Sequence, residues 1–307
     1  MTLSRGFAAG TLLLATLPAC SADKQDFTPL ATLHMGTATL QVDRAPGKLT
    51  ATDADVLDWI KTGAKAVNHY YGRFPVNKLR ILVKPSHHTT GTTYGDEDGA
   101  FIRLGVGADD TAAELGQSWV ITHEMVHTAF PQMPDAQHWI EEGIATYVEP
   151  VARAQVGDLS VAYLWQETVE GMPKGLPEPG DQGLDHTHTW GRTYWGGALF
   201  CLLADVRIRE QTKNRYGLQD ALRGILAAGG NIQTEGSIEQ ALAAADKAVG
   251  VTVLEDLYQQ MKDKPVDVDL NALWKRLGVV YRDGQISFDD QAPEAAIRKA
   301  ITAADTR

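Results

Sequence analysis

The amino-acid sequence predicts an α+β fold in which a small lobe with a short β-sheet precedes a mainly helical lobe. Up to about residue 108, short segments with β-type patterns surround a single long amphipathic helix. Beyond that point, segments with helical periodicity dominate the chain. The 307 residues are 44% hydrophobic and 22% charged, a composition that suits a globular protein with a substantial core.

The first 19 residues have the layout of an export signal. Arg5 precedes an apolar segment at 6–17 that is too short to span a bilayer. The letters LPAC that follow resemble the lipobox of bacterial lipoproteins, although Pro18 departs from the usual small residue there. We therefore expect an exported, periplasmic protein of the cell envelope that is attached to the membrane only through a lipid on Cys20, with residues 20–36 as a tether. Ordinary cleavage, which would yield a soluble exported protein, is the alternative.

Residues 37–108 form the predicted N-terminal α/β lobe. A helix is expected over 53–71, because its apolar residues recur at helical spacing and form one stripe. The stripe consists of Val56, Ile60, Ala64, Val67 and Tyr71. Strand-type patterns predict three strands, at 37–42, 79–83 and 100–106.

Residues 109–275 form the predicted helical lobe. Thr111 and Glu114 indicate a capping box for a helix that runs to Phe130 and is ended by Pro131. Further helices are expected at 137–151, 159–169 and 190–209, with a loop rich in Pro and Gly at 171–189.

Residues 276–307 form the predicted C-terminal unit, a hairpin followed by a helix. Asp283 and Gly284 stand between two short β-type segments, which is a hairpin signal, and the last helix is expected at about 293–303. Cys201 lies in an apolar run and is expected to be a buried free thiol, with a disulfide to Cys20 as the alternative.

The charge balance argues against nucleic-acid binding. The net charge is −11, and the chain has no cluster of Lys and Arg that could neutralise phosphates.

Residues 122–127 read THEMVH and raise the question of a zinc site. His123 and His127 are four residues apart, so on a helix they share one face and can chelate one ion. A catalytic zinc needs a third protein ligand and an open position. The metzincin pattern is excluded, because Phe130 and Met133 stand where that class has Gly and His. Without a third ligand, the motif would be only a pair of histidines on a helix.

The stretch 139–149, WIEEGIATYVE, resembles the second metal-binding helix of gluzincins in the aminopeptidase N group, where a Trp and an aliphatic residue precede Glu-Gly-x-Ala. This resemblance implies a zincin-like fold, one zinc per chain, and Glu142 as the third ligand. His138 is the rival ligand. The spacing of 14 residues between His127 and Glu142 is shorter than in aminopeptidase N itself. Gly143 and Ala145 are small, which lets the two metal-binding helices approach closely enough to share an ion.

Three further residues receive roles in the predicted site. Glu124 lies beside the ligands without being one, which suits a general base. The resemblance implies that Tyr194, in a Tyr-x-x-Gly pattern, donates a hydrogen bond to the oxyanion. It also implies that Glu149 accepts a hydrogen bond from a zinc-bound imidazole, while a solvated acid at a helix end is the alternative. His186 or His188 could supply a second donor, and this question stays open.

These residues predict a zinc-dependent metallopeptidase that hydrolyses peptide bonds in the cell envelope. A bound zinc ion would lower the pKa of its water and polarise the carbonyl, with Glu124 as base. The resemblance to gluzincins implies that the peptide or protein substrate lies along the strand at 100–106, as an edge strand of the N-terminal lobe. The Gly-x-Met-Glu-Asn motif that anchors a free amine in aminopeptidase N is missing there, so exopeptidase activity is not supported and the cleavage mode stays open. The alternative is a non-catalytic, zinc-containing binding or scaffolding lipoprotein with a gluzincin fold.

Overall fold

The computed structural model describes residues 27–304. The predicted export signal and the lipidation site Cys20 lie outside the described residues. Within the described range, no helix is both long enough and apolar enough to cross a membrane.

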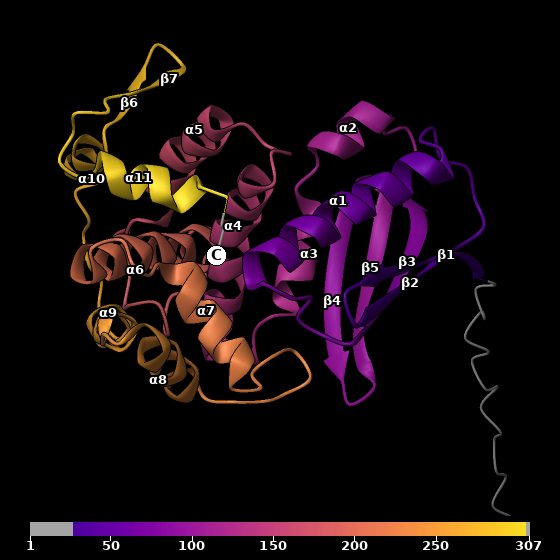
Figure 1. Cartoon of the computed structure of the whole chain (residues 1–307), viewed down its shortest axis with the longest axis horizontal. Helices are drawn as coiled ribbons and strands as arrows, with labels where there is room; N and C mark the ends of the chain where they lie inside the picture. The colour runs from indigo at the N-terminus through magenta and orange to yellow at the C-terminus, as the bar shows by residue number, and fades with distance from the viewer. Residues whose placement is uncertain (1–26, 305–307) are drawn as a thin grey trace, which may run out of the picture.

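The N-terminal lobe is a five-stranded sheet with helix α1 (Asp53–Tyr71) across one face (Figure 1). The strands are β1 (Thr28–Met35), β2 (Ala38–Arg44), β3 (Lys78–Ser86), β4 (Thr90–Asp96) and β5 (Gly99–Gly107), in the spatial order β1-β2-β3-β5-β4. The three central strands are parallel, and both edge strands run antiparallel to their neighbours. Buried side chains alternate along β3, which is the pattern of a sheet covered on one face.

Two strands differ from the prediction. The tether expected at 20–36 is wrong in its second half, because residues 28–35 form β1 and pair with β2. Strand β4 was not expected, since its sequence TGTTYGD has no alternating apolar residues. Gly91 and Gly95 suit this strand, because neighbouring parts of the chain lie so close to them that a larger residue would clash.

The helical lobe is built around α4 and α6, while α2 lies beside α1 of the N-terminal lobe (Figure 1). Its helices are α2 (Ala112–Gln117), α3 (Val120–His127), α4 (His138–Gln155), α5 (Val161–Gly171), α6 (Gly197–Thr212), α7 (Leu218–Ala227), α8 (Ile238–Val249), α9 (Val253–Met261) and α10 (Leu270–Leu277). A π-helical turn, Gly191–Gly196, leads directly into α6. The hairpin β6 (Val279–Arg282) and β7 (Gln285–Phe288) and the last helix α11 (Ala295–Thr302) confirm the predicted C-terminal elements.

The helix expected from Thr111 to Phe130 is broken into α2 and α3. Its capping box is confirmed, since Thr111 and Glu114 bond to each other in both directions. Ser118 then adopts extended angles and its carbonyl accepts a hydrogen bond from Trp59 of α1, so a new helix starts two residues later. Helix α4 runs four residues beyond the expected end, through Pro150, because its last turns are buried in the core.

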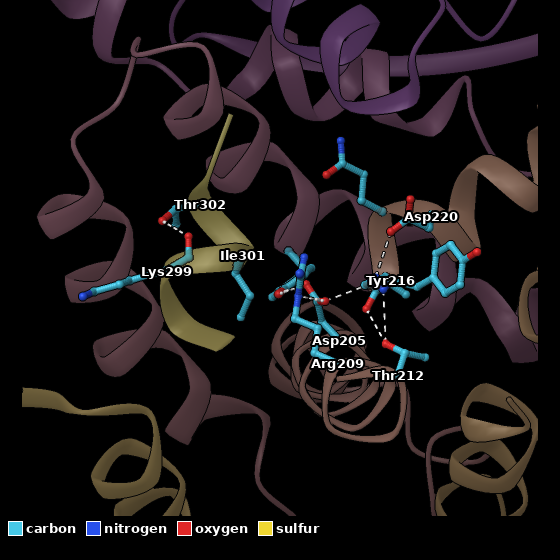
Figure 2. Close-up of polar contacts among 12 residues, drawn as sticks. Asp205, Arg209, Thr212, Tyr216, Asp220, Lys299, Ile301 and Thr302 are labelled. Carbon is cyan, nitrogen blue, oxygen red and sulfur yellow. Dashed lines mark hydrogen bonds and ion pairs between the residues drawn. The ribbon is translucent and has the colours of Figure 1, made fainter. Parts of the chain in front are cut away.

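A buried polar cluster holds the central helices in place (Figure 2). Asp205 of α6 accepts from Arg209 Nε at 2.7 Å, from Tyr147 Oη of α4 at 2.8 Å, and from the backbone N–H of Leu218 at 2.9 Å. These bonds satisfy a carboxylate that is almost fully buried, and they tie α4, α6 and the start of α7 to one another.

Helices α4 and α6 cross at two glycines. A Cβ atom built on Gly143 would lie 2.4 Å from the backbone of Gly197, and one on Gly197 would lie 2.3 Å from the carbonyl oxygen of Trp139. The close approach expected from Gly143 was to the other metal-binding helix; that expectation is wrong for this residue, because Gly143 packs against Gly197 of α6. This crossing fixes where α4, which carries Glu142, stands against α6 and the turn with Tyr194.

Candidate metal centre

Helices α3 and α4 bring two histidines and one carboxylate together. His123 and His127 point from one face of α3, and Glu142 points from the second turn of α4. The Glu142 Oε2 atom lies 3.1 Å from His123 Nε2 and 3.6 Å from His127 Nε2. One ligand atom from each of the three residues lies within 4.8 Å of the others.

This geometry fits a tetrahedral zinc site. Zinc–nitrogen and zinc–oxygen bonds of about 2.0–2.2 Å at tetrahedral angles place neighbouring ligand atoms about 3.4 Å apart. The two measured separations from Glu142 lie on either side of that value. The donor set of two imidazoles and one carboxylate is one that zinc uses in catalytic sites.

The rival ligand His138 lies on the other side of Glu142. Its Nε2 is 3.3 Å from Glu142 Oε1, and its Nδ1 is 3.1 Å from Glu141 Oε2. Glu142 thus turns one oxygen to the two imidazoles of α3 and the other to His138. Hydrogen bonds from these three histidines outweigh the effect of burial and hold the pKa of the Glu142 carboxyl well below its usual range.

Glu124 is buried between α3 and the edge strand β4. Its Oε2 atom accepts a hydrogen bond from the Thr93 hydroxyl at 2.6 Å. A Cβ atom built on Gly91 would lie 2.2 Å from Glu124 Cγ and 2.6 Å from Oε1, so only glycine leaves room for this carboxylate. Glu124 lies next to the cluster in sequence but is not part of it.

Tyr194 lies near His123, in the π-helical turn. Its ring is stacked near that of His123 with centroids 6.3 Å apart. Partial burial, together with the charge and the hydrogen bond of Glu142, raises the pKa of Tyr194 to about 12. The phenol therefore keeps its proton throughout the neutral range.

Glu149 does not make the contact expected of it. Its Oε1 accepts from Arg153 Nη1 at 2.9 Å, and no bond to an imidazole is found in the part of the chain that the structure describes. The alternative of a solvated acid is also wrong, since Glu149 is only 5% exposed. Burial raises the pKa of Glu149 to about 7, although Arg153 opposes this. The i,i+4 spacing of Glu149 and Arg153 was a sequence signal for this pair.

The loop histidines lie away from the cluster. His186 is exposed and pairs with Asp263 through Nε2 at 2.9 Å, and His188 is exposed. Cys201 is buried and free, as expected, and burial raises the pKa of its thiol.

The strand expected to bind substrate is not at the edge of the sheet. Residues 100–106 belong to β5, which has β3 on one side and β4 on the other. The edge beside the cluster is β4, and sequence reasoning missed it together with the contacts from Gly91 and Thr93 to Glu124. The small, polar letters TGTTYG gave no strand pattern, although two glycines so close in sequence can mark close packing.

Comparison with known proteins connects this geometry to a fold. No protein-family model matches the chain, and no curated protein matches it. Among solved structures, an aminopeptidase N family protein from Idiomarina loihiensis superposes with a TM-score of 0.63 and 11% identity, over 87% of this chain and 53% of that one. The M1 zinc metallopeptidase from Deinococcus radiodurans gives a TM-score of 0.52 and 14% identity, over 79% and 52%.

A mutant of the Deinococcus radiodurans enzyme bound to the substrate Tyr-Ser-Ala gives a TM-score of 0.52 and 13% identity, over 79% of this chain and 53% of that one. At such identities the likeness establishes the fold. The chain has the gluzincin-type fold of M1 zinc metallopeptidases, which confirms the predicted zincin-like α+β architecture. It spans about half the length of these structures.

Proposed function

We propose that the protein is a zinc metallopeptidase. The observation that carries this proposal is the convergence of His123, His127 and Glu142, with the carboxylate of Glu124 buried beside them and outside the ligand set. A structural zinc site does not need a carboxylate outside the ligand set, whereas hydrolysis needs one as a general base. Zinc held by these three residues would supply a Lewis acid that activates water and polarises a peptide carbonyl.

The chain's own residues supply the remaining chemistry. Glu124 takes the proton of the attacking water and passes it to the leaving amine; the Thr93 hydroxyl holds its Oε2, which leaves Oε1 for the proton. Tyr194 donates its hydroxyl hydrogen to the oxyanion that forms from the carbonyl. A phenol of ordinary pKa, about 10, already keeps this hydrogen at neutral pH.

The substrate backbone adds to the free edge of β4. The carbonyl of Gly95 accepts from the side chain of Gln132, which lies off the sheet, so the backbone groups of Gly95 face away from β5. Along an antiparallel strand, the backbone N–H and C=O groups of successive residues point alternately to the two sides of the strand. The backbone groups of Thr93 and Gly91, two and four residues before Gly95, therefore face the same free side. An extended peptide paired there lies beside Glu124. The loop at Ile232 packs against Gly95 and limits this site at its far end.

We also propose that the enzyme acts on peptides or proteins in the cell envelope, held there by a lipid on Cys20. The LPAC stretch after an apolar segment supports this placement. Labelling of expressing cells with a radioactive fatty acid tests it. Label should enter the wild-type protein and be absent from Cys20→Ser, whereas equal or absent labelling of both would show that the protein carries no lipid at this residue.

Hydrolysis of a mixed peptide library, followed by mass spectrometry, tests the activity. Wild-type protein should cleave internal bonds. Glu124→Gln should lose at least about 100-fold in rate, because it removes the proton acceptor and leaves the three ligands in place. Zinc retained in the wild type without any cleavage would instead identify a non-catalytic binding protein.

A further inference from the structure

An apolar pocket opens beside the metal centre, at the side of His123 that faces Tyr194. Its cavity volume is about 290 Å³, and His123 and Tyr194 form part of its lining. The remaining walls come from α4, α5, α6 and α11, from the residue just before α3, and from the turns around Met172–Gly175 and Gly191–Gly196. They include Trp119, Leu164, Trp165, Met172, Leu202 and Ile301.

Aromatic side chains gather at this pocket although water reaches them. Trp119 is 50% exposed and Trp190 is 60% exposed, and both line the cavity. Trp119 packs edge-on against His123 with centroids 4.9 Å apart, and Trp190 stacks near Tyr194 at 5.8 Å. Exposed tryptophans that flank a concave apolar surface are typical of a binding site, because they bury a large area when a ligand arrives.

Three charged side chains line the pocket: Glu149, which is almost fully buried, and Glu167 and Lys174, which are not. Glu149 accepts from Arg153, and Arg153 also bonds to Asp158 at 2.6 Å. Two apolar side chains of the lining, Ile301 of α11 and Leu202 of α6, are almost fully buried. The most buried charge of the lining therefore has a partner, and the lining is mainly apolar apart from Glu167, Lys174 and the unpartnered indole N–H of Trp165.

We propose that this pocket receives one large apolar side chain, aromatic or long aliphatic, of the substrate residue next to the cleaved bond. The inference rests on the proposed peptidase function and names the substrate class of the same site. The volume lies at the lower end of the range for ligand pockets, which suits a single large side chain rather than a bulky ligand. His123 and Tyr194 at the pocket place that side chain beside the reacting carbonyl.

The first experiment varies one residue of a cleaved peptide on either side of the bond. Each methylene removed from a side chain in an apolar pocket costs about 10-fold or more in kcat/KM, so Phe or Leu should exceed Ala, Asp and Lys by at least about 100-fold at one of the two positions. Equal rates for all residues at both positions would overturn the proposal and leave the peptidase function intact. A preference for Lys or Arg would overturn it as well.

Two variants then change the pocket in opposite directions. Leu164→Trp fills the cavity and should lower the ratio of Phe to Ala cleavage at least 10-fold, whereas Ile301→Ala deepens it and should favour Trp over Phe. Leu222→Phe enlarges a buried leucine of α7 that does not line the pocket, and should leave the ratio unchanged. Thermal unfolding identifies any variant that fails to fold. An unchanged ratio in folded Leu164→Trp would contradict the assignment.

A binding measurement separates this inference from the peptidase function. N-acetyl-phenylalanine amide is titrated against the purified full chain, and the fluorescence of the tryptophans around the pocket is followed. We expect a saturable change that N-acetyl-alanine amide does not produce and that Leu164→Trp abolishes. If this binding occurs in a protein that hydrolyses no peptide, the pocket assignment stands and the peptidase function fails. No saturable change in the wild type overturns the pocket.

Discussion

Replacing Gly143 by Ala tests whether the crossing of α4 and α6 sets the geometry of the metal centre. The new Cβ would lie 2.4 Å from Cα and C of Gly197. Carbon atoms in contact prefer about 3.5–4.0 Å, so the methyl group is about 1 Å too close. The atoms that it meets are helix backbone, which cannot rotate away as a side chain can. The two helices must therefore separate.

The expected loss of stability follows from two opposing contributions. Forcing extra volume into a packed contact costs about 1–3 kcal/mol. Alanine in a helix interior gains about 0.5–1 kcal/mol over glycine. Gly143→Ala should thus be less stable by about 1–2 kcal/mol, which lowers the melting temperature of a chain of this size by a few degrees.

The same separation should weaken zinc binding, because Glu142 is the preceding residue. A shift of about 1 Å is half the length of a zinc–oxygen bond of about 2 Å. A loss of 1.4 kcal/mol in binding corresponds to about 10-fold in affinity, and we expect at least that much. Competition with a fluorescent zinc chelator measures the affinity, and scanning calorimetry measures the melting temperature.

Gly116→Ala is the matched control. Gly116 lies in α2, and a Cβ atom there would meet no other atom within 4 Å. This variant should be as stable as the wild type or slightly more stable, with unchanged zinc affinity. The reasoning is refuted if Gly143→Ala melts no lower than Gly116→Ala and binds zinc equally well.

Three further changes have specific expected results. Gly91→Ala should push the Glu124 carboxylate out of place, lower kcat at least 10-fold and leave the zinc content at the wild-type value. Peptide kinetics and elemental analysis measure these two quantities. Loss of zinc in this variant would contradict the assignment of Gly91 to the position of the base alone. His138→Ala frees one oxygen of Glu142 and should weaken zinc binding about 10–100-fold in the chelator competition, whereas unchanged affinity would mean that His138 does not orient the ligand. The pKa of Glu149 is raised from 4.5 to about 7, because the folded chain favours its protonated form. Protonation of Glu149 therefore contributes to the free energy of unfolding fully below about pH 4.5, and this contribution is lost as the pH rises through 7. The loss amounts to about 3 kcal/mol and should be absent in Glu149→Gln, which urea unfolding at pH 5 and pH 8 would show; an identical pH slope in both proteins would contradict it.

The elements predicted most accurately are those in which the apolar pattern and the capping residues of the sequence match the buried face of the element. Helix α1 has the expected bounds, because its apolar stripe coincides with its buried face and Thr52 and Asp55 cap its start. The split between α2 and α3 could not be foreseen, since it depends on a hydrogen bond from Trp59 to the carbonyl of Ser118, two residues far apart in sequence. A tertiary contact causes this break, and no local sequence pattern predicts such a contact.

For the candidate site, sequence spacing and resemblance indicated which side chains would meet, but not what surrounds them. The i,i+4 spacing predicted the shared face of His123 and His127, and the Glu-Gly pattern indicated Glu142. The contacts of Glu124 with β4 were missed, because a strand of glycines and threonines carries no periodic apolar signal. Glu149 was assigned from the offset in a resembling family, while its actual partner, Arg153, stood four residues away on the same helix.

The most direct test of the central claim is the zinc content of the purified chain, measured by elemental analysis without chelators or a metal-affinity tag. We predict about one zinc per chain in the wild type and in Glu141→Ala, which changes the neighbouring acid outside the cluster, and a loss of zinc in Glu142→Ala. No zinc in the wild type even after it is added back, or full retention by Glu142→Ala, would contradict the assigned site and the peptidase function that depends on it.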